Sequence, residues 1–185
     1  ALHGFTVNQT FDITSNTEGI CCRYVYDGYY EFYPFPCVLE IHYTLNVEGF
    51  LFKAIVRNTG TEPLPFHIGW HPYFKLVGNW ELNPEPSARL AKNIFSHPGE
   101  KIPYAGHQWV DEVDGAFFYS NNPRIRNDKY TLEIKTPASL VQVFRPANAP
   151  FMAVEPITGL GHSDFPWLEV APGKCREIRS AITLE

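Results

Sequence analysis

The clearest pattern of apolar and polar positions is a strict alternation over residues 38–47. Apolar side chains at every second position from Leu39 to Val47 alternate there with Glu40, His42, Thr44 and Asn46. Such a period of two predicts a strand with one buried face. A second extended run, 50–57, follows Glu48-Gly49 and ends at Asn58-Thr59-Gly60. The two runs therefore predict an antiparallel hairpin.

Further short runs with strand character predict an all-β fold, an antiparallel β-sandwich. They span residues 130–135, 140–144, 151–154 and 178–184. Between Lys75 and Gly106 the pattern gives way to Asn, Pro, Gly and Ser, which predicts long surface loops. No helix longer than a turn or two is expected. Because neither a repeat nor a change of composition divides the chain, residues 1–185 are expected to form a single domain.

The composition agrees with this fold and narrows the partners. The chain has 14 Phe, 10 Tyr and 4 Trp beside 16 Pro and 13 Gly, as in turn-dense β proteins. A net charge of -5 without a basic run argues against nucleic acid as a partner. No stretch approaches the roughly 20 apolar residues that span a bilayer, so no membrane partner is expected. The N-terminus also lacks the regions of a signal peptide, which favours a cytoplasmic location.

Cysteine usage gives no sign of a metal or redox site. The four cysteines, Cys21, Cys22, Cys37 and Cys175, lack the C-x-x-C spacing of zinc sites and redox pairs. A reducing compartment is the simplest interpretation.

The most unusual segment is residues 65–74, which hold two histidines, four aromatic residues and two prolines. His67 and His71 could be a metal pair on a helix, but Gly69 and Pro72 argue against a helix. On a strand, residues four apart lie about 13 Å apart, too far to share one ion. The two imidazoles instead share a face beside aromatic rings such as Tyr73, which suits a sugar site. An aromatic core strand with hydrogen-bonded histidines remains the alternative.

Several carboxylates are further candidates. Glu155 follows the apolar run 151–154 and precedes Pro156. There it could be partly desolvated, with a raised pKa and greater basicity, or it could be a solvated glutamate at a strand end. The acids Asp111, Glu112 and Asp114 precede an aromatic run, and Asp164 lies in a polar loop. These carboxylates could accept hydrogen bonds from sugar hydroxyls, or they could lie in solvated turns. The chain has no nucleophile elbow, phosphate loop or dinucleotide motif, and no cofactor is expected.

The chain resembles the aldose 1-epimerase (galactose mutarotase-like) family in five segments that follow one another in order. These are Leu2-His3-Gly4-Phe5, the strand around residues 38–45, Gly69-Trp70-His71-Pro72-Tyr73-Phe74, Val113-Asp114-Gly115-Ala116-Phe117 and Val154-Glu155-Pro156. The His-Pro-Tyr-Phe motif with a later Glu-Pro is the most specific of them. The resemblance implies a β-sandwich of the galactose mutarotase-like type, or supersandwich, that binds a sugar.

The same resemblance implies roles for individual residues in a cofactor-free mutarotation. Glu155 matches the general base that takes the proton of the anomeric hydroxyl, and His71 matches the general acid that protonates the ring oxygen. His3 and Asp114 match positions that hydrogen-bond the sugar. His67 and Tyr73 are the further sugar contacts expected from the segment itself.

Two departures from the family pattern carry expectations of their own. The family places an arginine four residues after the first motif histidine, where this chain has Val7. Strands that precede this motif in family members are absent here, which would leave a sheet edge unpaired. An unpaired edge invites another chain, so a homodimer or a separate N-terminal fragment is a possible partner.

Other functions on the same scaffold are a hexose-6-phosphate 1-epimerase and a non-catalytic sugar-binding protein. The first needs a basic phosphate pocket, for which Arg23, Arg57, Arg124, Arg126 and Arg145 are available. Val7 favours the second, and the presence of both His71 and Glu155 opposes it. A glycosidase or lyase on a similar sandwich is a third alternative.

Overall fold

The structure, a computed structural model, describes residues 4–91, 100–106, 109, 111–160 and 166–185. Within these ranges the chain consists of β-strands and one short 3-10 helix, η1 (Phe5–Asn8). It forms two compact units: unit 1 runs to Pro65 and includes Glu169–Ser180, and unit 2 comprises Phe66–Leu168 and Ala181–Glu185. The single domain expected for residues 1–185 stays a prediction. No helix in the described part of the chain is long and apolar enough to cross a membrane.

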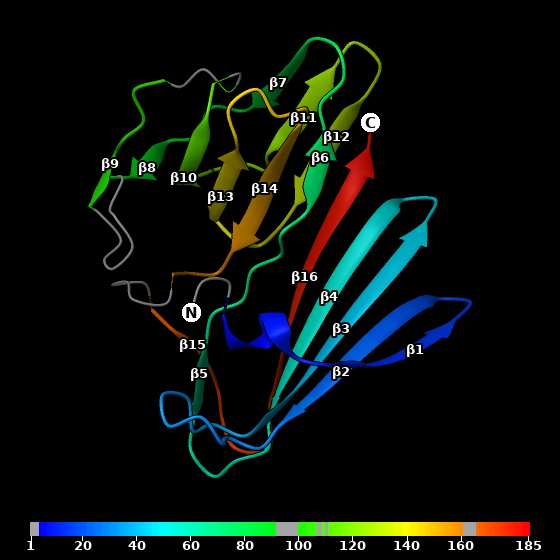
Figure 1. The fold of residues 1–185 in the computed structure, drawn as a ribbon, viewed down its shortest axis with the longest axis vertical. Helices are drawn as coiled ribbons and strands as arrows, with labels where there is room; N and C mark the ends of the chain where they lie inside the picture. Colours follow the sequence, from blue (N-terminus) through cyan, green and yellow to red (C-terminus); the bar gives the residue numbers. More distant parts are fainter. Residues whose placement is uncertain (1–3, 92–99, 107–108, 110, 161–165) are drawn as a thin grey trace. The chain divides into compact units, whose positions relative to one another are not determined.

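Unit 1 is built on an antiparallel meander of four strands, drawn in blue to cyan in Figure 1. The strands are β1 (Asp12–Asn16), β2 (Gly19–Tyr26), β3 (Cys37–Asn46) and β4 (Gly49–Asn58). The hairpin predicted from the alternation is confirmed, with β3 and β4 paired from Asn46↔Gly49 to Cys37↔Asn58. The Asn46 side-chain oxygen accepts the amides of Glu48 and Gly49 and so closes its turn.

The tyrosine-rich segment after β2 forms an aromatic cluster within unit 1. Tyr26 is almost fully buried, with Phe5 and Tyr33 packed around it. Its hydroxyl donates to the carbonyl of Tyr33 at 2.6 Å, and the Tyr33 hydroxyl donates to the carbonyl of Pro65 at 2.7 Å. Tyr26 is therefore buried and Tyr33 partly buried, while the hydroxyl group of each donates to a carbonyl.

Unit 2 is an antiparallel sandwich. One sheet has six strands, in the order β6 (Tyr73–Lys75), β14 (Phe151–Ile157), β13 (Leu140–Arg145), β10 (Val113–Phe118), β8 (Ala88–Leu90) and β9 (Lys101–Pro103). The facing strands are β12 (Thr131–Lys135), β11 (Arg124–Asn127) and β7 (Trp80–Asn83), next to the last residues of β16 (Cys175–Leu184). The short strands β5 (Leu64–Phe66) and β15 (Leu168–Val170), like β16, have residues in both units.

The core of unit 2 lies between its two sheets. It is formed by alternate residues of the strands, including Val141, Val143, Met152 and Val154 from the six-stranded sheet and Leu82, Ile125 and Ile134 from the other. Because successive side chains on a strand point to opposite faces, the residues between these core positions point away from the core. The outer face of the six-stranded sheet therefore carries Asp114, Ala116, Gln142 and Glu155.

Three sequence predictions need correction. The region from Lys75 to Gly106 was expected to be long loops, but it contains β7, β8 and β9. These strands have three or four residues, too few for an alternation to be detected. Asp114 lies inside β10 rather than before a strand. Glu155 does not end its strand either, since β14 continues to Ile157.

Candidate active site on the six-stranded sheet

The segment of residues 67–75 lies alongside β14 in a single antiparallel register. The pairing begins as a ladder, with Tyr73 opposite Ala153, and extends beyond β6 to a bridge between Gly69 and Ile157. The amide of Trp70 donates to the carbonyl of Pro156, and the amide of Thr158 donates to the carbonyl of Ile68. This register sets His71 opposite Glu155. It also places His67, His71 and Tyr73 on the same face, since they alternate along an extended chain.

His71 and Glu155 are in direct contact. The Nε2 atom of His71 lies 3.2 Å from Oε1 of Glu155. The Glu155 side chain is about 10% exposed and that of His71 about 30%, so one side of the pair opens to solvent. An imidazole and a carboxylate in contact can each give or take a proton near neutral pH.

The environment of Glu155 makes its carboxylate a stronger base than usual. Burial, followed by the negative charge of Asp114, raises the pKa of Glu155 to about 7. A base works best when its pKa lies near the working pH, because it is then both available and able to hold a proton. The sequence-based interpretation of Glu155 as a partly desolvated base agrees with this environment, whereas a water-exposed strand end does not.

Gln142 connects Glu155 with Asp114 across three strands. It lies directly opposite Glu155 in the pairing of β13 with β14. Its Nε2 donates to Oδ1 of Asp114 at 2.7 Å. Asp114 is therefore hydrogen-bonded to Gln142, the neighbour of Glu155 on the same face of the sheet. Sequence reasoning missed Gln142, although it is the one polar residue among the apolar side chains of residues 140–144.

Tyr73 lies against the other side of His71. The two rings stack with centroids 4.8 Å apart and planes 29° apart. The rings of Tyr73 and Phe151 pack edge-to-face, with centroids 5.5 Å apart. Tyr73 is 56% exposed, so part of its ring still faces solvent beside the pair.

His67 is packed differently from His71. Its ring stacks on Trp167 at 4.1 Å. Neither ring nitrogen has a hydrogen-bond partner among the described residues, and burial lowers the pKa of the imidazole. The ring also lies against Gly159, where an added Cβ would come within 2.3 Å of His67 Cε1. His67 thus shares the face of His71 but lies between Trp167 and a glycine.

This packing predicts a stability effect at Gly159. The Gly159→Ala variant should lose roughly 1–3 kcal/mol, because Trp167 limits how far the His67 ring can move away from the new methyl group. Urea unfolding measures the loss. The control is the double variant with His67→Ala, which removes the clash and should cost less than the two single losses together. Equal stability of Gly159→Ala and the parent would contradict the contact.

Three further residues were named in the sequence analysis. His3 and Asp164 lie outside the described residues. Val7, at the position of the family arginine, lies in η1 and is 60% exposed.

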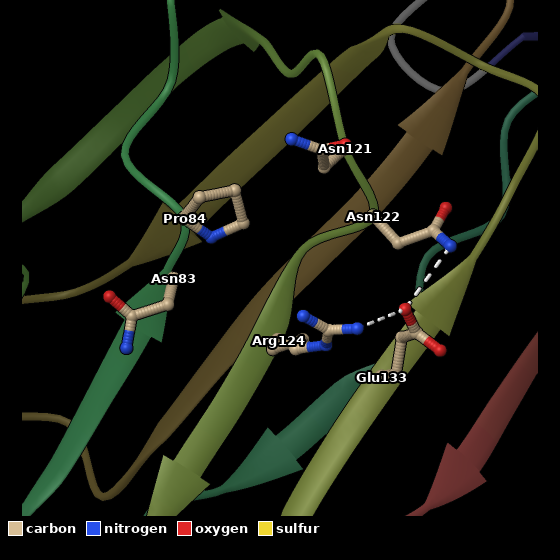
Figure 2. A pocket seen from close by; sticks show the side chains of 6 residues that line it. All are labelled: Asn83, Pro84, Asn121, Asn122, Arg124 and Glu133. Atoms are coloured by element: carbon tan, nitrogen blue, oxygen red, sulfur yellow. Dashed lines mark hydrogen bonds and ion pairs between the residues drawn. The ribbon is translucent and has the colours of Figure 1, made fainter.

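A polar pocket of about 410 Å³ lies on the other sheet of unit 2 (Figure 2). There the side chains of Arg124 and Asn122 both point at Glu133, and they donate to its Oε1 at 2.9 Å and 3.3 Å. Lys135 lies 3.6 Å from the other oxygen. Since both oxygens of Glu133 already face fixed cationic or amide partners, this carboxylate serves the structure rather than acid–base chemistry.

The structure describes no donor set suited to a metal ion. No group of three or more His, Cys, Asp and Glu side chains gathers for one in the described ranges. The four cysteines all lie within those ranges and are free thiols.

Together these features define an all-β sandwich with an acid–base pair on one sheet face. The sequence matches the family model described as aldose 1-epimerase over residues 1–112. The chain belongs to the aldose 1-epimerase family. A comparison with curated proteins gave no match.

Several solved structures have the same fold as this chain. A candidate aldose 1-epimerase from Escherichia coli K12 is 20% identical, with a TM-score of 0.81 over 95% of this chain and 68% of that chain. A galactose mutarotase-like protein from Clostridium acetobutylicum is 13% identical, with a TM-score of 0.82 over 99% and 68%. A galactose mutarotase related enzyme from Lactobacillus acidophilus is 19% identical, with a TM-score of 0.76 over 99% and 73%. At these identities the likeness shows the fold, which is the predicted galactose mutarotase-like sandwich.

Proposed function

We propose that the protein interconverts the α and β anomers of a free aldose. The observation that carries this proposal is the contact between His71 and Glu155. Mutarotation needs a base at the anomeric hydroxyl and an acid at the ring oxygen, and both of these oxygens are bonded to C1. An acid and a base that serve one carbon must therefore lie side by side, as these two side chains do.

The proposed reaction is a pair of proton transfers. Glu155 takes the proton of the C1 hydroxyl while His71 protonates the ring oxygen, and the bond from C1 to the ring oxygen breaks. The aldehyde turns about the bond between C1 and C2. Reclosure on its other face, with both groups in reversed roles, gives the second anomer. Asp114 and Gln142 lie beside the pair and supply hydrogen bonds that hold the sugar hydroxyls.

The charges in unit 2 favour a free aldose over an aldose phosphate. Arg124 pairs with Glu133 and Arg126 with Glu81, while Arg145 donates to the carbonyl of Asp111. These arginines are engaged away from the His71–Glu155 pair. Asp114 and Glu155 instead give that face a negative character that would repel a phosphate.

Polarimetry tests the proposal. Fresh α-glucose, α-galactose and the matching 6-phosphates should be followed with and without the protein. We expect acceleration with at least one free sugar and a bell-shaped dependence of kcat on pH. The acidic limb should lie near 7, since a base with that pKa must be ionised to act. If no free sugar reacts faster than in buffer, the enzyme assignment is wrong, and calorimetric titration with the same sugars then tests a sugar-binding function.

A further inference from the structure

The orientation of the His71 ring plane matters for its proposed role as a general acid. Rotation of an imidazole about its outer torsion is broad, so the neighbours of the ring decide which orientation it adopts. A general acid must hold its N–H within hydrogen-bond reach of one oxygen atom. A flat neighbour against the ring face removes this freedom.

Tyr73 is placed to be that neighbour. It follows His71 by two residues on the same extended segment, and Ala153, opposite it on β14, has only a methyl group. The small side chain of Ala153 leaves room for Tyr73 to lean over the imidazole, where the rings stack at 4.8 Å. Phe151 meets Tyr73 edge-on at 5.5 Å and limits its movement away from His71. The rings of His71, Tyr73 and Phe151 thus contact one another in sequence, the first two stacked and the last two edge-to-face.

We propose that Tyr73 is a positioning residue, which holds the His71 imidazole against Glu155 by ring stacking. The proposal rests on the function proposed above. It differs from the role of direct sugar contact expected from the sequence. The contact uses the ring of Tyr73 and not its hydroxyl, so phenylalanine should replace it and an aliphatic residue should not.

The stack should also favour the charged form of the imidazole. An aromatic face attracts a cation through its quadrupole, by about 0.5–1 kcal/mol at exposed sites. The carboxylate of Glu155, in contact with His71, acts in the same direction when it is ionised. Loss of the Tyr73 ring should therefore shift the titration of His71 to lower pH while Glu155 stays in place.

The test compares Tyr73→Leu with Tyr73→Phe, and uses Tyr29→Leu as a matched control because Tyr29 is a similarly exposed tyrosine in unit 1. NMR titration of His71 should show the shift to lower pH in Tyr73→Leu alone. In the mutarotation assay kcat should fall about 10-fold in Tyr73→Leu, with KM nearly unchanged, and Tyr73→Phe should keep the parent rate. Thermal unfolding checks that each variant folds.

The outcomes separate this proposal from the function on which it rests. If Tyr73→Leu raises KM and leaves both kcat and the His71 titration unchanged, Tyr73 is a sugar contact and the positioning role is wrong. An equal loss of activity in Tyr73→Phe would overturn it as well, because the hydroxyl would then be the essential group. If the parent shows no mutarotation, the proposed function fails, while the NMR titration still decides whether Tyr73 controls the imidazole.

Discussion

Replacing Glu155 with Gln should lower the mutarotation rate by roughly two to four powers of ten. The amide keeps the size of the side chain and its hydrogen bonding, but it cannot take a proton from the anomeric hydroxyl. Binding of the sugar should change little, so the loss should appear in kcat. Polarimetry under saturating sugar measures it.

A second replacement shows whether the two groups act on one transition state. His71→Asn should also lower kcat, because the departing ring oxygen then lacks its proton donor. The double variant should be about as slow as the slower single variant, since groups that act as a unit do not have additive effects. A Glu155→Gln protein that is as fast as the parent would remove the basis for the proposed mechanism.

Glu155→Gln should make the folded protein more stable at pH 8, by up to about 3 kcal/mol. The pKa of Glu155 is raised from 4.5 to about 7, so the folded state binds its proton more tightly than the unfolded chain does. This group therefore costs no stability below pH 4.5. Its cost grows as the pH rises toward 7, and it is fully present above that. The amide is never ionised and removes the cost.

Urea unfolding of the parent and of Glu155→Gln at pH 4.5 and pH 8 tests whether the stability gain of the variant grows with pH. The advantage of the variant should be present at pH 8 and small at pH 4.5. Glu133→Gln serves as the control, since Glu133 is about equally buried but is paired with Arg124; that substitution should not stabilise the protein at pH 8. An advantage of Glu155→Gln that is the same at both values would show that burial of its charge is not the cause.

The sequence predicted the elements whose signal is local. The alternation over residues 38–47 lies within one strand, and it correctly identified β3 and its hairpin with β4. Glu155 was found as a base candidate because the apolar run before it already indicated burial. The short strands β7, β8 and β9 could not be found this way, because their pairing depends on partners far along the chain.

The parts of the site that were missed depend on register between strands. Gln142 has no signal of its own that links it to Glu155 or Asp114, which come from two other strands. The effect of Asp114 on the pKa of Glu155 has the same origin, as does the fit of His67 against Gly159. A single sequence contains the residues but not the pairing that brings them together.

The central row of the site runs across the strands, with His71, Glu155, Gln142 and Ala116 each on a neighbouring chain segment. The spacing between these groups is therefore fixed by main-chain hydrogen bonding, at about 4.8 Å per strand, and not by the conformation of a loop. A slip of one residue in β13 or β14 would turn its member of the row into the core and bring a neighbouring valine or Pro156 out in its place. The proposed chemistry therefore depends on the hydrogen-bonded pairing of these strands. Small movements of the connecting turns should leave the four side chains in place, whereas a change of register would separate them.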